Sequence, residues 1–225
     1  MALELVIAQN EEDAARHAAE LLAAAAGRGE HIAFSGGSTP RRAYELAGQL
    51  ERDWSGVDAW LGDERSVPVR DPRSNLLLVR ESLVASARVP PRLHPVDTSL
   101  PPTRAAAAYD IELEGVELGL ALQGIGPDGH TASLYPNAPS LDVSDARAVA
   151  APAELEPFVD RVTMTVPMLC DAREVVFLVV GAGKAEAARK AFAEPPSQAT
   201  PASLVRSRAG RTVVILDPAA AEHVR

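Results

Sequence analysis

The residues best suited to chemistry lie in one turn, Gly124-Ile125-Gly126-Pro127-Asp128-Gly129-His130. Three glycines and a proline follow the apolar run 116–123, so a buried strand is predicted to end at this turn. Asp128 stands two residues before His130, and a carboxylate there can orient an imidazole or adjust its basicity. A solvated turn with a surface histidine is the simpler interpretation of an isolated Asp-x-His. The glycines at a strand end, where α/β proteins bind ligands, favour a functional one.

A second candidate is the loop Ser35-Gly36-Gly37-Ser38-Thr39-Pro40, which joins a predicted strand at 31–34 to a predicted helix at 41–50. Pro40 suits the first helical turn, and Ser38 or Thr39 suits the N-cap. Small residues leave backbone N–H groups uncovered at the positive end of a helix, which makes a phosphate cradle. The loop is neither a Walker loop nor a dinucleotide fingerprint. From the residues alone, a plain Gly/Ser turn is an equal alternative.

Charged side chains follow two further predicted strands. Asp63 and Arg65 come soon after a strand at 57–61, and they either solvate its end or border a site. Arg65 can present paired donors to a phosphate, a carboxylate or a polarised carbonyl. Lys184 follows the strongest predicted strand, 174–180, at the start of a helix. Because the helix dipole disfavours a cation there, a bound anion would explain this lysine better than a surface position does.

Predicted strands alternate with predicted helices along the whole chain. The strands are 3–8, 31–34, 57–61, 116–123, 147–151, 161–167, 174–180 and 212–216, and the helices follow Asn10 and cover about 41–50, 75–86, 102–113 and the stretch after 184. This alternation predicts a single Rossmann-like α/β domain over residues 1–225, with a mainly parallel sheet and helices on both faces. Segments 62–65 and 89–95 are expected to be connections, and a short helix is expected after 217.

The candidate ligand-binding segments all follow the carboxyl ends of predicted strands. The segments 35–40, 62–65, 124–130 and 181–184 each follow a strand. The carboxyl ends of parallel strands share one edge of a sheet, where ligands bind. We therefore expect these four segments to converge on one site.

Composition narrows the class of partner and the compartment. The chain has 225 residues, 47% of them apolar, and a formal net charge of −9, which argues against a nucleic-acid surface. The single Cys170, in an apolar context, is expected to be a buried thiol of a cytoplasmic protein. No signal peptide and no membrane span are expected. The oligomeric state is left open.

The turn at Gly124 to Leu134 resembles the signature of the 6-phosphogluconolactonases, a family related to the glucosamine-6-phosphate deaminases. The resemblance extends to Gly62-Asp63-Glu64-Arg65, to Val67-Pro68 and to Asp71-Pro72-Arg73-Ser74-Asn75, and it covers nearly the whole chain. It implies hydrolysis of 6-phospho-D-glucono-1,5-lactone to 6-phosphogluconate in the oxidative pentose phosphate pathway, with a small-molecule sugar phosphate as substrate.

The resemblance also implies a role for each candidate residue. His130 is the general base, Asp128 holds its ring, and Arg65 or loop amides meet the oxyanion. Asp63 stands where the deaminases keep a catalytic acid, and its role in a lactonase is left open. The residues expected to hold the phosphate are Ser35, Gly36, Gly37, Ser38, Thr39, Arg161 and Lys184. No cofactor and no metal are expected, because the five histidines are scattered along the chain.

Two other functions compete with lactone hydrolysis. The deaminases carry a glutamate a few residues after the motif histidine, whereas this chain has Tyr135 there. A phenol with a pKa of about 10 cannot replace a carboxylate at neutral pH. Arg65 also stands where the deaminase pattern has an aromatic residue. A non-catalytic sugar-phosphate sensor would normally carry an output domain, for which this chain has no room. A serine hydrolase is not expected, because the chain lacks a Gly-x-Ser-x-Gly elbow.

Overall fold

The structure is a computed structural model, and it describes residues 3–153 and 158–224. Its centre is a seven-stranded sheet in which every pairing is parallel. In spatial order the strands are β1 (Leu3–Ile7), β10 (Arg211–Leu216), β9 (Glu174–Val179), β6 (Leu118–Gln123), β2 (His31–Phe34), β3 (Asp58–Leu61) and β5 (Arg92–His94). A separate three-stranded antiparallel sheet is formed by β4 (Asp63–Arg65), β8 (Arg161–Met164) and β7 (Ala148–Ala151).

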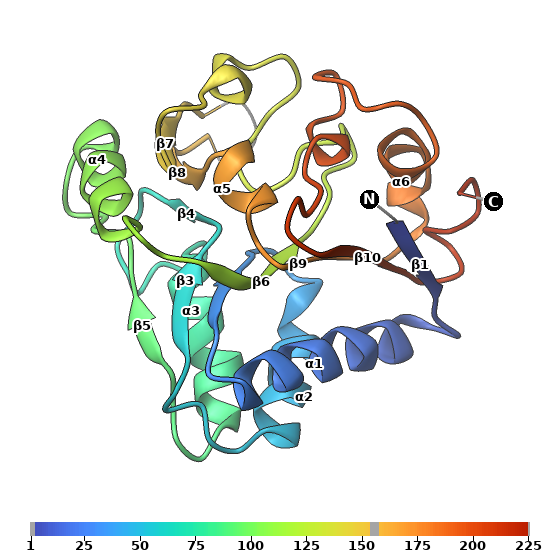
Figure 1. Cartoon of the computed structure of the whole chain (residues 1–225), viewed down its shortest axis with the longest axis horizontal. Helices are drawn as coiled ribbons and strands as arrows, with labels where there is room; N and C mark the ends of the chain where they lie inside the picture. The colour runs from blue at the N-terminus through green and yellow to red at the C-terminus, as the bar shows by residue number, and fades with distance from the viewer. Residues whose placement is uncertain (1–2, 154–157, 225) are drawn as a thin grey trace.

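Helices cover both faces of the large sheet (Figure 1). One face carries α1 (Glu11–Gly27), α2 (Pro40–Leu50) and α3 (Asn75–Val79), which continues into a π-helical turn at Arg80–Val84. The other face carries α4 (Pro102–Glu112), α5 (Val166–Cys170) and α6 (Ala185–Phe192). Short 3₁₀ turns lie at Pro139–Asp142, Ala182–Lys184 and Pro201–Ser203. The predicted α/β fold, with a mainly parallel sheet covered on both faces, is confirmed.

The strand β9 shows why two cores form. Val175, Phe177 and Val179 pack into the core on the α4–α6 side. Val176 and Leu178 pack into the core on the α1–α3 side. Because successive side chains of a strand point to opposite faces, a strand buried on both sides must be apolar at nearly every position. Burial on both faces therefore explains the continuous apolar run from which this strand was predicted.

The helix starts follow from capping chemistry. The Asn10 side chain accepts a hydrogen bond from the Asp13 backbone N–H at 2.9 Å, so the predicted cap of α1 is confirmed. Of the two predicted caps, Thr39 is the N-cap of α2, and the helix begins at Pro40, one residue before the predicted start. Thr39 makes no capping hydrogen bond, because its own backbone is already helical (φ −58°, ψ −45°).

Four segments differ from the sequence prediction. Residues 63–65 form β4, since they pair with β8, a strand far away in the sequence. Residues 92–94, expected to be a connection, form β5 and extend the edge of the large sheet beside β3. The predicted strand 161–167 stops at 164, because Thr165 caps a short helix through the Met168 N–H. The stretch after 217 forms turns in place of the expected helix.

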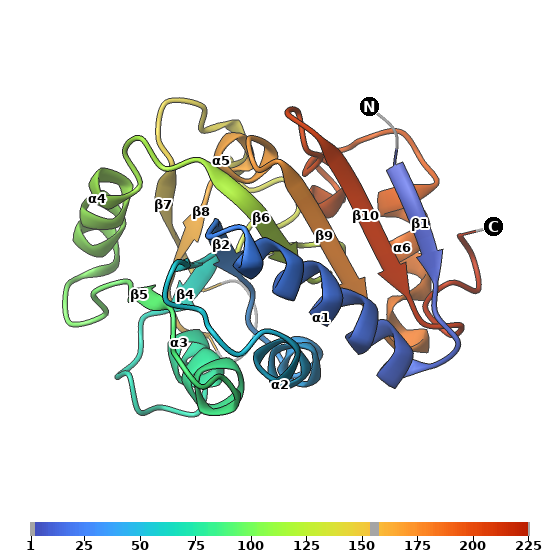
Figure 2. The same ribbon diagram turned by 60° about the horizontal axis from the view of Figure 1, so that its bottom comes forward.

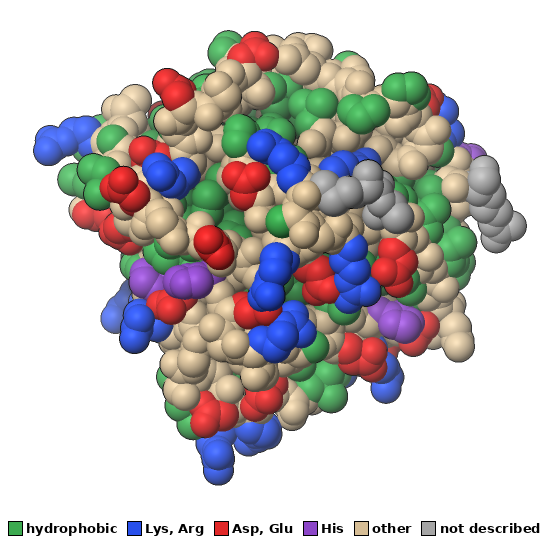
Figure 3. All heavy atoms as spheres, viewed as in Figure 1, with side chains coloured by type: hydrophobic (Ala, Val, Ile, Leu, Met, Phe, Trp, Pro, Cys, Tyr) green, Lys and Arg blue, Asp and Glu red, His purple; other side chains and the backbone are tan. Residues whose placement is uncertain are grey.

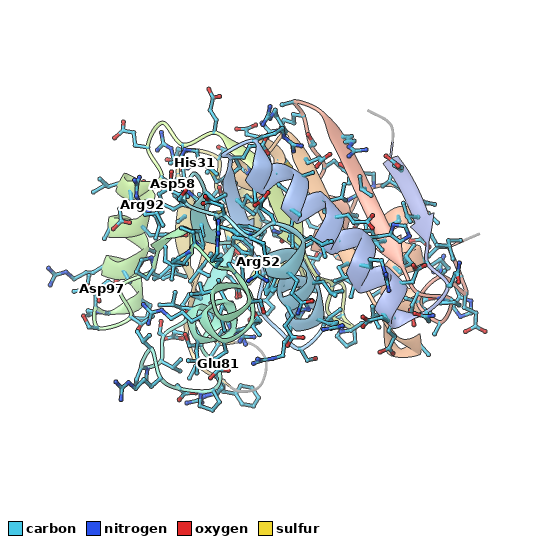
Figure 4. The ribbon with its side chains drawn as sticks, turned by 90° about the horizontal axis from the view of Figure 1, so that it is seen from below. His31, Arg52, Asp58, Glu81, Arg92 and Asp97 are labelled. Atoms are coloured by element: carbon cyan, nitrogen blue, oxygen red, sulfur yellow. The ribbon has the colours of Figure 1, made fainter. Side chains whose placement is uncertain are left out.

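The edge where the strands of the large sheet begin carries a cluster of charges (Figure 4). His31, Asp58 and Arg92 are register partners at the starts of β2, β3 and β5. Oδ1 of Asp58 lies 2.6 Å from His94 Nε2 and 3.2 Å from Arg92 Nη1. The His94 ring also stacks on Trp60, with 3.9 Å between centroids. These contacts hold the outer strands together at the edge opposite the strand ends.

The surface carries charges of both signs. Lys and Arg side chains are interspersed with Asp and Glu over the face drawn in Figure 3. None of the helices in the part of the chain that the structure describes is both long and apolar enough to cross a membrane.

Candidate active site

A cavity of about 250 Å³ opens at the edge where the central strands end. The strands β9, β6 and β2 lie side by side in the middle of the sheet (Figure 2), and the segments that follow them form the cavity wall. Its lining includes the whole loop 35–40, Asp63, Arg65, Gln123, the segment 124–126, His130, Thr131, Ala132, Arg161 and Lys184. All four segments that were expected to converge therefore contribute to one pocket.

The geometry of His130 is fixed by Asp128. Nδ1 of His130 lies 2.6 Å from Oδ1 of Asp128, and the same oxygen accepts the His130 backbone N–H at 3.2 Å. With Nδ1–H donated to the carboxylate, Nε2 is left as the acceptor. Gly126 makes this packing possible, because a Cβ there would lie 2.0 Å from Nδ1. Asp128 does not line the cavity itself. Its effect on the cavity is to hold the imidazole of His130, which does line it.

Asp63 is a buried carboxylate with both oxygens engaged. Its side chain lines the cavity although the residue is only 5% exposed. Oδ1 accepts a hydrogen bond from Asn75 Nδ2 at 3.0 Å, and Oδ2 accepts one from Ser133 Oγ at 2.6 Å. Asn75 Nδ2 also donates to the Asp63 backbone carbonyl at 2.7 Å. This arrangement makes Asp63 a fixed acceptor in the cavity wall.

The neighbouring Glu64 has a structural role. Its carboxylate accepts hydrogen bonds from the backbone N–H groups of Asn75 and Leu76 at 2.7 and 2.8 Å, and from Ser74 Oγ at 3.0 Å. Burial raises the pKa of Glu64, and these donors oppose that rise. Glu64 thus anchors the start of α3, and with it the Asn75 side chain that holds Asp63.

Arg65 and Arg161 form the cationic part of the wall. They are register partners of β4 and β8, so their side chains leave the small sheet on the same face. Arg65 Nη1 donates to the Arg73 carbonyl at 2.7 Å, and the Arg161 guanidinium lies 5.9 Å from the centre of the Tyr135 ring. The Nε atoms of both arginines are buried without a hydrogen-bond partner among the described residues. The pair can therefore receive an anion.

The loop 35–39 is held rigidly over the cavity. Tyr44 Oη donates to the Ser35 carbonyl at 2.7 Å and accepts the Ser35 backbone N–H at 2.9 Å. Gly36 lies directly against Asn75, because a Cβ at Gly36 would be 1.9 Å from Asn75 Oδ1. The loop and the Asp63 carboxylate are consequently positioned by the same asparagine.

Lys184 completes the polar lining. It lies in the 3₁₀ turn before α6, half-buried at the cavity wall. Desolvation lowers the pKa of the Lys184 ammonium, and the Asp128 carboxylate opposes that shift. A bound phosphate would oppose it too, since an anion stabilises the charged form of the amine.

Several polar residues of this site had no role assigned from the sequence. They are Asn75, Gln123, Thr131 and Ser133. Gln123 could have been identified from the sequence as a candidate site residue, because it is the polar last residue of an otherwise apolar strand. Ala132 adds backbone strain, with φ at +49° beside the cavity, and strained residues of this kind cluster at active sites and ligand-binding sites. In residues 3–153 and 158–224, no three His, Cys, Asp or Glu side chains are grouped to hold a metal ion.

Comparison with known sequences supports one family. Residues 6–214 match the family model described as glucosamine-6-phosphate isomerases/6-phosphogluconolactonase. The chain is 37% identical to a 6-phosphogluconolactonase of Synechocystis, over 86% of this chain and 84% of that protein. It is 33% identical to a 6-phosphogluconolactonase of Streptomyces coelicolor, over 95% of this chain and 90% of the relative.

Solved structures with the same fold include 6-phosphogluconolactonases and a deaminase. The 6-phosphogluconolactonase of Trypanosoma brucei superimposes with a TM-score of 0.87 at 25% identity, covering 100% of this chain and 99% of that one. The Thermotoga maritima enzyme of the same name gives a TM-score of 0.82 at 27% identity, covering 96% of this chain and 99% of its own. A monomeric glucosamine-6-phosphate deaminase, with a TM-score of 0.85 at 19% identity over 99% of this chain and 100% of that one, shares the fold alone.

Proposed function

The chain belongs to the glucosamine-6-phosphate isomerase/6-phosphogluconolactonase family, and we propose that it hydrolyses 6-phospho-D-glucono-1,5-lactone to 6-phosphogluconate. The observation that carries this proposal is the imidazole of His130, which Asp128 holds in place and which lines one cavity together with the register partners Arg65 and Arg161. The relatives named as lactonases support the same reaction. The activity belongs to the oxidative pentose phosphate pathway, and the expected compartment is the cytoplasm.

The proposed chemistry begins at His130. Nε2 takes a proton from a water molecule, whose oxygen then bonds to the lactone carbonyl carbon. The carbonyl π electrons move to its oxygen and form a tetrahedral oxyanion. When the carbonyl reforms, the bond to the ring oxygen breaks, and that oxygen takes the proton back from His130 to become a hydroxyl. Asp128 keeps Nδ1 protonated throughout, so that Nε2 alone exchanges the proton.

The cationic groups would bind two negatively charged groups of the reacting substrate, the oxyanion and the phosphate. We assign Arg65, or the backbone amides of the glycine turn, to the oxyanion, and Arg161, Lys184 and the loop 35–39 to the phosphate. Because the phosphate is remote from the reacting carbon, holding it fixes the lactone carbonyl relative to His130. The role proposed for Asp63 is that of a fixed acceptor for a substrate hydroxyl.

The deaminase alternative lacks its supporting carboxylate. Tyr135 stands at the position where a deaminase would carry glutamate, and its ring lies 5.4 Å from that of His130. Burial raises the pKa of the Tyr135 phenol, so the group stays neutral at physiological pH. It cannot supply the negative charge that ring opening and proton shuttling need.

Turnover on two substrates tests the assignment. The purified protein should hydrolyse 6-phosphogluconolactone rapidly, after spontaneous hydrolysis is subtracted, and should release no ammonia from glucosamine 6-phosphate. Ammonia production that His130→Ala abolishes would replace the lactonase with the deaminase. Tight binding of 6-phosphogluconate with turnover of neither substrate would leave the non-catalytic sensor.

A further inference from the structure

Gln123 is a buried polar group that has no part in the proposed reaction. It is the last residue of β6, it is 1% exposed, and it lines the cavity. Its Oε1 accepts a hydrogen bond from Thr131 Oγ1 at 2.9 Å. Its Nε2, which carries two N–H donors, has no hydrogen-bond partner among the described residues.

An unpaired amide in this position needs an explanation. A buried donor left without a partner loses the hydrogen bonds that water would have given it, and native proteins rarely leave one unsatisfied. Nε2 lies near Gly62, 3.5 Å from the place where a Cβ on that glycine would be. Gly62 directly precedes Asp63, and both Gln123 and Asp63 line the cavity.

We infer that the Gln123 Nε2–H group donates a hydrogen bond to a ring hydroxyl of the sugar lactone, an inference that rests on the proposed function. A hydroxyl both accepts and donates, so a site that recognises it needs a donor and an acceptor together. Gln123 supplies the donor, and Asp63 supplies the acceptor. The lactone carbonyl and the phosphate call for charged donors, which Arg65, Arg161 and Lys184 already provide.

Thr131 is the positioning residue for this amide. Its hydroxyl lies within hydrogen-bonding distance of Gln123 Oε1 and also of the Gly124 carbonyl, at 2.8 Å. Thr131 therefore joins the side chain of Gln123 to the glycine turn that carries His130. Fixing Oε1 in this way leaves Nε2 as the end of the amide that is available to a ligand.

The test compares Gln123→Met, which keeps the length of the side chain and removes both polar atoms, with Gln49→Met on the exposed surface of α2. Gln123→Met should raise KM for 6-phosphogluconolactone by roughly 10-fold and leave kcat within about 2-fold, because a neutral hydrogen bond to a hydroxyl serves binding. Calorimetry should show 6-phosphogluconate binding weakened by the same factor. Thr131→Val should change KM in the same direction and by less, and Gln49→Met should change neither quantity.

Monodeoxy analogues of the lactone identify the hydroxyl. For the one analogue that lacks the hydroxyl in question, wild type and Gln123→Met should have the same KM, whereas the other analogues should still distinguish them. Equal KM ratios for every analogue would overturn the inference. So would a loss confined to kcat with product binding unchanged, because that pattern places the amide on the oxyanion.

Gln123→Glu tests the direction of the hydrogen bond. It keeps an oxygen for Thr131 and replaces the donor with a second oxygen, so it should bind 6-phosphogluconate at least as weakly as Gln123→Met. Wild-type affinity in Gln123→Glu would show that the amide presents its oxygen to the ligand, and would overturn the inference. A wild-type protein that binds 6-phosphogluconate in calorimetry and hydrolyses no lactone would contradict the proposed function, while the binding comparison would still decide the role of Gln123.

Discussion

Arg65 and Arg161 lie directly opposite one another on β4 and β8, and the Nε atom of each is buried without a hydrogen-bond partner among the described residues. Like charges directly opposite on an antiparallel pair destabilise a sheet. We therefore expect a repulsion between the two guanidinium groups that an anion in the cavity would relieve. In the proposed function, this relationship would link the topology of the small sheet to the binding of an anionic substrate.

Arg161→Met should weaken substrate binding without weakening the fold. We expect KM for 6-phosphogluconolactone to rise by the loss of a charge-assisted contact, worth roughly 1.5–3 kcal/mol. KM for the unphosphorylated lactone should change far less. The thermal midpoint of the free protein should stay constant or rise, because the repulsion with Arg65 is removed. An equal loss on both lactones would show that Arg161 does not recognise the phosphate.

His130→Ala should lower kcat by roughly 10²–10⁴-fold, the usual contribution of a positioned general base. Binding of 6-phosphogluconate, measured by calorimetry, should change little. Asp128→Asn should lower kcat by a smaller factor, because the imidazole keeps a hydrogen-bonding neighbour and loses the charge that stabilises its protonated form. Turnover of His130→Ala close to the wild-type value, after subtraction of spontaneous hydrolysis, would eliminate this residue as the base.

Product binding should depend on the protonation of Lys184. Its pKa is lowered by desolvation, so in the free protein the ammonium loses its proton at a lower pH than an ordinary lysine, whose value is 10.5. Affinity for 6-phosphogluconate should therefore be full below that lowered pKa and should fall as pH rises through it. Lys184→Arg, which keeps its charge, should remove this fall. Superimposable pH profiles for the two proteins would show that the amine does not contact the phosphate.

Gly36→Ala should impair the site through Asn75. The added methyl group would lie 1.9 Å from Asn75 Oδ1, so the asparagine must move and release its hydrogen bonds to Asp63. We expect lower kcat/KM and a lower thermal midpoint. Gly37→Ala is the contrasting variant, because it places its methyl group in open space at a strained φ of +95°. A Gly36→Ala enzyme with wild-type kinetics would show that Asn75 does not hold the loop and Asp63 together.

The sequence by itself determined most strands of the large sheet and the segments that border the site. Its apolar runs define strands buried on both faces, such as β9, and glycine-rich turns follow the strands that end at the cavity. Local signals were sufficient there, because strand periodicity, capping and turn chemistry depend on neighbouring residues. The predicted connections 62–65 and 89–95 were wrong for the same reason: β4 and β5 are three-residue strands that exist only through their distant partners.

Tertiary structure alone decided how the polar groups of the site are paired. Asp63 meets Ser133 across 70 positions of the chain, and Arg65 meets Arg161 across two strands of a sheet that local patterns do not predict. It likewise decided that Glu64 anchors α3 while Asp63 faces the cavity, although the two carboxylates are adjacent in the chain. The physical reason is that a hydrogen bond depends on the distance and direction between atoms, and for residues far apart in sequence these are fixed only when the strands pair.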